Sequence, residues 1–113
     1  MSTRVQAAPV ASRLSPTQVE RLRRLLVEEH GAQQARAVEL QDPVDLEPDL
    51  VEVLLVRCQE ALDEIEAALA LITHGAYGAC SQCRAAIPYE RLEAVPPTQR
   101  CVSCQASLDR VLR

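Results

Sequence analysis

The chain contains four cysteines arranged in two close pairs, Cys80–Cys83 and Cys101–Cys104. Two residues separate the members of each pair, and 17 residues separate the pairs. Thiolate pairs at this spacing are typical of a tetrahedral zinc site, and a site closed by four thiolates leaves no coordination position for a substrate or a water molecule. We therefore predict one structural zinc ion, and no catalytic metal, held by Cys80, Cys83, Cys101 and Cys104.

The remaining composition favours helices with little aromatic core. The 113 residues include no Phe and no Trp, and Tyr77 and Tyr89 are the two tyrosines. Ala, Leu and Val supply most of the apolar side chains, which suits a helix pair better than a thick globular core. Because small metal-binding modules couple folding to metal binding, we expect zinc to supply much of the stability of the C-terminal third.

Charge and hydropathy exclude several classes of function. The net charge of −4 argues against general binding to duplex DNA, which requires a basic face. No apolar run approaches the ~20 residues of a membrane span, and the first 14 residues lack the apolar segment of a secretory signal. Cysteines that stay reduced and bind metal are typical of the cytoplasm, which agrees with the missing membrane span and the missing secretory signal. We therefore expect a cytoplasmic protein without a membrane segment and without sequence-specific DNA binding.

Two long helices are predicted before the cysteines. Ser15 and Gln18 flank Pro16 as a capping box, which predicts that a helix begins there. Two prolines and four carboxylates within residues 41–49 interrupt the helical pattern and predict an acidic turn. A second helix is expected from about Asp49 to Thr73, with Asp49 and Glu52 as its cap pair. Gly75 stands where a left-handed C-terminal cap falls.

The second helix carries an apolar seam that predicts coiled-coil packing. Apolar residues alternate at spacings of four and three over three heptads, at Val51, Leu55, Cys58, Leu62, Ile65, Leu69 and Ile72. Two helices joined by a short turn fold back as an antiparallel hairpin. The predicted fold is mainly α: a flexible arm (1–14), a coiled-coil hairpin (15–74) with an acidic tip at 41–49, and a four-cysteine zinc finger ending in a short amphipathic helix (75–113).

Part of the second helix has more apolar surface than the first helix can cover. Six of the seven residues from Leu50 to Val56 are apolar. Such a stripe favours a partner surface, while self-association of the hairpin or cover by residues 1–14 are equally compatible with it. We expect a monomer, with a dimer through residues 50–56 as the alternative.

The other reactive side chains give no catalytic pattern. Cys58 lies on the seam and is expected to be a buried apolar residue rather than a fifth ligand. His30 and His74 are isolated and are interpreted as surface or capping side chains. Because no nucleophile stands beside a base in the sequence, we predict that the protein is not an enzyme.

The zinc-finger segments resemble the DksA/TraR family of bacterial RNA polymerase regulators. The likeness is carried by Ile72–Cys83 (ITHGAYGACSQC), Ile87–Ala94 (IPYERLEA), Cys101–Cys104 (CVSC) and the acidic turn. Membership of this family implies a regulator that binds RNA polymerase without sequence-specific DNA contacts. Its hairpin is expected to enter the secondary channel of the polymerase, and its acidic tip to approach the catalytic centre.

The resemblance also assigns roles to individual residues. It implies that Asp42 and Asp45 act at the tip and that Arg57 contacts the polymerase. The family tip reads Asp-x-x-Asp-x-Ala, whereas Glu47 occupies the place of that Ala here and adds bulk and charge. The family's best-known member binds the alarmone ppGpp through basic residues, whose places hold Glu64, Val95 and Gln105 in this chain. We therefore predict little or no ppGpp synergy through this protein's own residues.

Two other interpretations remain open on the sequence. The first is a zinc-stapled coiled-coil adaptor or dimer that acts on another protein, which the apolar stripe and Glu47 favour. The second is a zinc-ribbon nucleic-acid binder, which the acidic charge and the lack of aromatic stacking residues disfavour.

Overall fold

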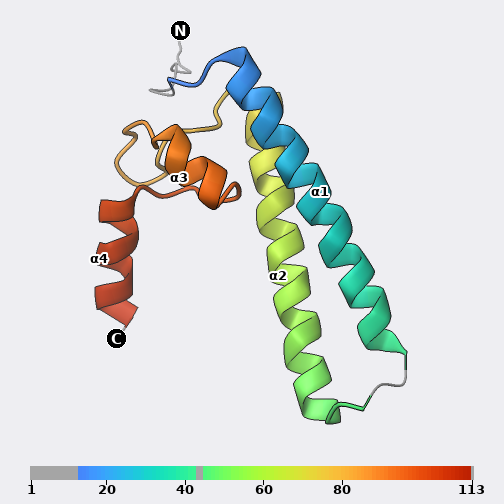
Figure 1. The fold of residues 1–113 in the computed structure, drawn as a ribbon. Coiled ribbons are helices and arrows are strands. Elements are labelled where there is room, and N and C mark those ends of the chain that lie inside the picture. Colours follow the sequence, from blue (N-terminus) through green and yellow to red (C-terminus); the bar gives the residue numbers. More distant parts are fainter. Residues whose placement is uncertain (1–12, 43–44, 113) are drawn as a thin grey trace, which may run out of the picture.

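The first two helices form an antiparallel hairpin, with the cysteine-containing segment beside its base (Figure 1). The computed structural model describes residues 13–42 and 45–112. Its helices are α1 (Pro16–Gln41), α2 (Pro48–Thr73), α3 (Tyr89–Ala94) and α4 (Val102–Leu112). The mainly α hairpin followed by clustered cysteines confirms the predicted fold class. Residues 1–12 of the predicted arm, residues 43–44 of the predicted tip and residue 113 lie outside the described residues.

The capping box at the start of α1 is confirmed. The backbone N–H of Gln18 donates to Ser15 Oγ at 3.1 Å, and the backbone N–H of Ser15 donates to Gln18 Oε1 at 3.0 Å. Pro16 takes the first helical turn, where the missing N–H costs no hydrogen bond. Local side-chain chemistry therefore fixes the point at which the hairpin begins.

The predicted cap pair of α2 is wrong. The N-cap residue is Glu47, and its side chain makes no capping hydrogen bond. Pro48 begins the helix because its fixed φ suits the first helical position. Asp49 therefore lies inside the first turn, where its carboxylate is close to the positive end of the helix dipole but is not placed as a cap.

The end of α2 forms a Schellman turn around Gly75. The N–H of Ala76 donates to the carbonyl of Leu71 at 2.8 Å, and the N–H of Gly75 donates to the carbonyl of Ile72 at 3.1 Å. Gly75 has φ +75°, a conformation that disfavours residues with a Cβ. The predicted left-handed cap is thus confirmed. The turn directs the chain away from the hairpin and into the first cysteine pair.

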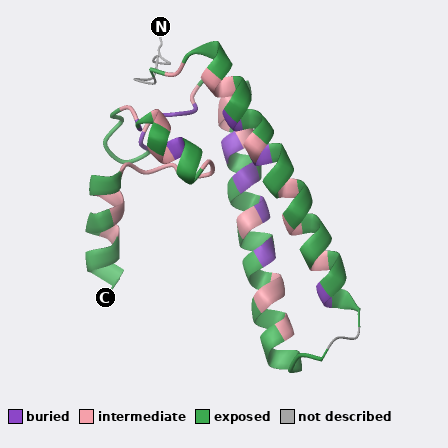
Figure 2. Cartoon of the chain, in the orientation of Figure 1, coloured by how far each residue is buried: buried purple, intermediate pink, exposed green. Residues whose placement is uncertain are grey.

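The main core lies where the base of the hairpin meets the zinc-finger segment. Buried side chains of α1 and α2 join those that follow Gly75, and the cluster comprises Leu22, Leu26, Ile65, Ala68, Tyr77, Cys80, Ile87 and Leu92. Towards the tip the seam is less covered (Figure 2). In that direction Cys58 and Leu62 are buried, whereas Val51 and Leu55 are half-buried.

The tip-proximal part of α2 keeps apolar side chains at its surface. Leu50, Val53 and Val56 are 44%, 48% and 52% exposed. In the described ranges, no helix combines the length and the hydropathy that a membrane crossing needs.

Candidate metal centre and surrounding surfaces

Two short turns present the four cysteines to one another. In the first turn, the N–H of Arg84 donates to the carbonyl of Cys80 at 2.9 Å, and the N–H of Cys80 donates to the carbonyl of Ala85 at 2.8 Å. Arg84 adopts φ +68°, the left-handed conformation that closes this turn. In the second, the N–H of Cys104 points at Cys101 Sγ at 3.4 Å as α4 begins. A hydrogen bond of 2.7 Å from the N–H of Ser81 to the carbonyl of Gln99 joins the two turns.

The sulfur positions fit a single tetrahedral ion. The four Sγ atoms lie within 4.8 Å of one another, and Cys83 Sγ and Cys101 Sγ are 3.9 Å apart. Four sulfurs bound about 2.3 Å from zinc in a tetrahedron lie about 3.8 Å apart. The donor set is therefore of the right kind and nearly the right size for zinc. With four thiolates there is no open position, so the ion is structural.

The electrostatics of the cluster also call for a cation. Burial acts to raise the pKa of the Cys80 thiol, but backbone N–H groups of Cys83, Cys101 and Gln82 outweigh it and lower the pKa to about 6. The pKa of Cys104 moves the other way, to about 12, because hydrogen bonds with the sulfurs of Cys101 and Cys80 stabilise its proton. Four adjacent sulfurs cannot all be thiolates unless a cation offsets their charge, and zinc supplies that charge.

Core packing and an ion pair fasten the metal centre to the hairpin, and a hydrogen bond within the zinc finger supports them. Cys80 is fully buried and belongs to the main core. Tyr77 donates its hydroxyl hydrogen to the carbonyl of Pro96 at 2.7 Å, which ties the loop between the two cysteine pairs to the segment before Cys80. Arg21 of α1 pairs with Glu93 of α3 at 2.9 Å. The zinc finger and the hairpin base therefore form one packed unit.

The acidic tip lies at the opposite end of the hairpin from the cysteines (Figure 1). Asp42, Asp45 and Glu47 are all exposed. Among the described residues, their carboxylates make no hydrogen bond and no ion pair, so their charge faces solvent. Arg57, on α2, is also exposed. The structure therefore separates the predicted partner-binding residues from the metal ligands by most of the length of the hairpin.

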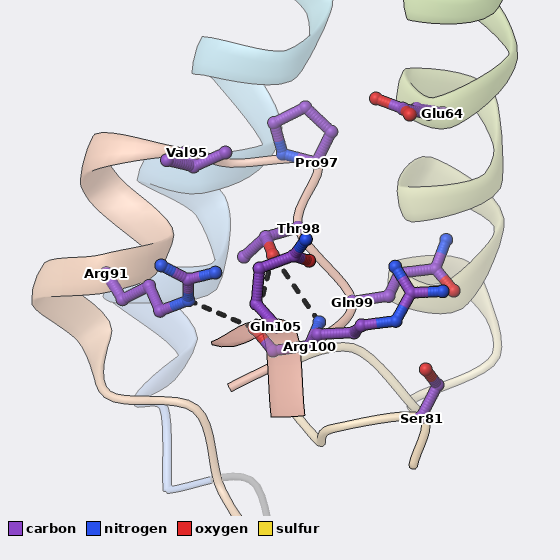
Figure 3. Close-up of a pocket in the computed structure, with 9 residues that line it drawn as sticks. All are labelled: Glu64, Ser81, Arg91, Val95, Pro97, Thr98, Gln99, Arg100 and Gln105. Carbon is purple, nitrogen blue, oxygen red and sulfur yellow. Dashed lines mark hydrogen bonds between the residues drawn. The ribbon is translucent and has the colours of Figure 1, made fainter. Parts of the chain in front are cut away.

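A cavity of about 400 Å³ lies between α2 and the zinc finger (Figure 3). It brings together Glu64, Val95 and Gln105, three residues far apart in the sequence. Arg91 and Arg100 also line it, and the sequence gives no sign that either residue lies beside α2. Arg91 Nε donates to the carbonyl of Arg100 at 3.0 Å, which holds one side of the cavity in place. No local sequence signal reveals this cavity, because its walls come from four separate segments.

The other cysteine and the two histidines considered in the sequence have roles in packing and in helix contacts. Cys58 is buried in the hairpin and lies outside the cluster of four cysteines, as expected. His74 Nδ1 lies 2.7 Å from the carbonyl of Ala70, so this histidine caps the end of α2. His30 Nε2 lies 2.9 Å from Glu66 Oε2 and links α1 to α2. The sequence did not predict that link.

Comparison with known proteins identifies the metal-binding segment. Residues 75–110 match the prokaryotic dksA/traR C4-type zinc finger family. General stress protein 16O of Bacillus subtilis is 43% identical over 51 residues, which is 45% of this chain and 31% of that protein. An uncharacterized protein of Aquifex aeolicus is 43% identical over 49 residues, or 43% of this chain and 34% of that protein. The matches therefore span about a third of the length of these curated relatives.

The whole fold also has relatives of known structure. Transcription factor DksA2 from Pseudomonas aeruginosa is similar over 95% of both chains, with a TM-score of 0.71 and 28% identity. The RNA polymerase binding protein and transcriptional regulator Dks from Chlamydia trachomatis has the same fold over 88% of this chain and 95% of its own, with a TM-score of 0.62 and 21% identity. The family match, the four clustered cysteines and the full-length likeness to DksA2 lead to one conclusion. Residues 75–110 of this chain are a zinc finger of the prokaryotic dksA/traR C4 type with one structural zinc site, and the whole chain has a fold similar to that of transcription factor DksA2.

Proposed function

We propose that this protein is a non-enzymatic transcription regulator that binds RNA polymerase through its secondary channel. The observation that carries the proposal is the likeness to transcription factor DksA2 along nearly the whole length of both chains. The likeness includes the hairpin as well as the zinc finger, and the hairpin is the part that enters the channel. In this proposal the protein acts in the cytoplasm.

The shape and charge of the hairpin support insertion into a pore. Two helices of 26 residues each give a rod about 39 Å long at 1.5 Å per residue. Asp42, Asp45 and Glu47 leave their carboxylates unpaired at its free end, among the described residues. Unpaired carboxylates brought close to a catalytic Mg²⁺ ion, or to the mobile elements beside it, alter the electrostatics of the initiation complex. Arg57 contributes to polymerase contact further along the rod.

The zinc finger has a supporting role in this proposal. It packs against the base of α1 and α2 and holds the hairpin at a fixed angle to the surface around the channel entrance. Zinc therefore supports function by stabilising the module that orients the hairpin, and it takes part in no chemical step.

We also propose that ppGpp adds little to the activity of this protein. Glu64, Val95 and Gln105 line one cavity, so the three places that the resemblance connects with the alarmone lie together. None of these three residues carries a positive charge, and Glu64 repels phosphate. Arg91 and Arg100 line the same cavity, so the proposal concerns only the three places that the resemblance connects with the alarmone. The test compares the affinity of ppGpp for the polymerase alone with its affinity for the complex. An unchanged affinity is expected, whereas a rise of tenfold or more, roughly 1.4 kcal/mol, would contradict this part of the proposal.

The tip is tested by neutralising its carboxylates. Asp42→Asn combined with Asp45→Asn preserves side-chain size and removes two charges. We expect this variant to lose its effect on transcription from regulated promoters while its affinity for polymerase falls less than about threefold, or 0.7 kcal/mol. Asp63→Asn combined with Asp109→Asn is the matched control, because both residues are exposed, lie away from the tip and undergo the same chemical change. Unchanged transcription effects in the tip variant would remove the tip from the mechanism.

The second candidate function is an adaptor that acts on another protein. The exposed Leu50, Val53 and Val56 favour it, because they present apolar surface away from α1. A zinc-loaded protein that is fully folded and yet fails to bind polymerase would favour the adaptor.

A further inference from the structure

The outer face of α2 near the tip is apolar and uncovered. At 100° per residue, Leu50, Val53 and Val56 lie on the side of the helix away from the seam that contains Cys58 and Leu62. These three side chains are about half exposed, and the first buried residue of α2 is Cys58 (Figure 2). We use the term outer α2 surface for Leu50, Val53 and Val56 together with Asp49 and Arg57, which flank them.

The two charges of the outer α2 surface have no partners within the described part of the chain. Arg57 is exposed and makes no ion pair there, and it is the one arginine between Arg36 and Arg84 in the sequence. Asp49 is exposed as well and is likewise unpaired there. The surface therefore offers a central apolar stripe with an unpaired anion at one end and an unpaired cation at the other.

This arrangement is complementary to itself when a second copy lies antiparallel. In such a pair, with a twofold axis at Val53, residues equally far from Val53 on either side meet at the same height. Asp49 and Arg57 lie four residues before and after Val53, and Leu50 and Val56 lie three residues before and after it. Each Asp49 therefore meets Arg57 of the other copy, and each Leu50 meets Val56 of the other copy, as expected of an isologous contact.

We propose that the outer α2 surface joins two copies of this chain in an antiparallel dimer. The dimer covers Val53 with its own counterpart and forms two symmetric ion pairs between Asp49 and Arg57. The contact is short, about 14 Å for nine helical residues, and falls below the ~1,200 Å² typical of a stable interface. The dimer is therefore weak and depends on concentration, with a dissociation constant on the order of tens of micromolar.

The dimer has a regulatory consequence that goes beyond the proposed function. Each hairpin lies along the other, and the doubled rod is too wide for a channel that admits one hairpin. The same Arg57 is assigned to polymerase contact in the monomer, so dimerisation and polymerase binding exclude each other. At high protein concentration, self-association therefore lowers the amount of monomer that is available to bind polymerase.

The test measures mass against concentration for the zinc-loaded full chain by sedimentation equilibrium, from about 5 to 500 µM. We expect the wild type to approach the dimer mass, and Arg57→Glu or Asp49→Arg alone to weaken association at least tenfold. A mixture of these two variants is expected to restore it, because the introduced arginine of one chain then faces the introduced glutamate of the other and the second ion pair is native. Glu28→Arg, an exposed charge reversal on α1, is the matched control and should leave association unchanged.

Three results would overturn the proposal. The first is a wild type that stays monomeric over the whole range. The second is a dimer that both single charge reversals leave intact, and the third is a mixture that fails to restore association although circular dichroism shows both variants folded. The assay contains no polymerase, so failure of the dimer and failure of the proposed function are distinguished.

Discussion

The four clustered cysteines differ in their exposure to solvent. Cys80 is fully buried and belongs to the main core, whereas Cys83 is exposed and Cys101 and Cys104 are half-buried. Loss of Cys80 therefore removes both a zinc ligand and a core contact. Its spacing from the other cysteines is plain in the sequence, but its place in the core is not, because burial depends on how the finger packs against the hairpin.

At the residue scale, Cys80→Ser is expected to release zinc. A serine hydroxyl is a far poorer zinc ligand than a thiolate, so zinc should fall from one ion per chain towards none and the segment after Gly75 should loosen. Zinc content by elemental analysis and near-ultraviolet circular dichroism measure the two effects. Cys58→Ala is the control, since Cys58 lies outside the cluster and its loss should leave one zinc per chain. A zinc-loaded, fully folded Cys80→Ser variant would defeat the four-thiolate assignment.

Tyr77 gives a prediction that depends on pH. Burial raises the pKa of Tyr77 to about 12, against an ordinary value near 10. Because the pKa is raised in the folded state, the stabilisation is complete below about pH 10 and is lost as the pH rises towards 12. Phenolate absorbance followed from pH 9 to 13 should show one late phase in the wild type that is absent from Tyr77→Phe. If the substitution leaves the late phase in place, the assignment to Tyr77 is wrong.

At the scale of elements, the starts of α1 and α2 differ in how well the neighbouring residues predict them. Ser15 and Gln18 contact one another within one turn, so the start of α1 is predictable from four residues. The predicted start of α2 is wrong because Asp49 is a favoured N-cap residue, whereas the helix begins at Pro48 and leaves Glu47, which makes no side-chain capping bond, at the N-cap. The helix α3 was not predicted, since six residues are too few to show a periodic pattern.

Gly75 and Gly31 give a pair of opposite predictions. Both have open space where a Cβ would stand, so neither substitution causes a clash. Gly75→Ala places an L side chain at φ +75° and should lower the free energy of unfolding by about 1 kcal/mol. Gly31→Ala in the interior of α1 should raise it by about 0.5–1 kcal/mol, because alanine favours the helix. Urea unfolding measures both changes, and a stabilising Gly75→Ala would contradict the Schellman turn.

At the scale of the whole molecule, the zinc finger and the hairpin base share one core. Leu22 and Leu26 of α1 contact the same buried cluster as Ile87 and Leu92, which follow the first cysteine pair. The sequence predicts each unit separately, through the seam and through the cysteine spacing. It does not predict the contact between them, because no pattern within either unit specifies the surface that the other covers.

The cavity beside α2 is a second example of a contact between separate segments that the sequence does not predict. The resemblance assigned Glu64, Val95 and Gln105 to one role by position alone, and the structure brings them together. Arg91 and Arg100 join them there, although nothing in the sequence places either residue beside Glu64. Residues that meet through tertiary packing are visible only once the fold is known.

Competitive binding to RNA polymerase tests the central claim most directly. Zinc-loaded protein carrying a fluorophore on its amino terminus is titrated with purified polymerase, and a protein known to occupy the secondary channel is then added. We predict a dissociation constant of about 1 µM or tighter, equivalent to roughly 8 kcal/mol, and displacement of the bound protein by the competitor. Absence of binding, or binding that the channel protein does not displace, would contradict it.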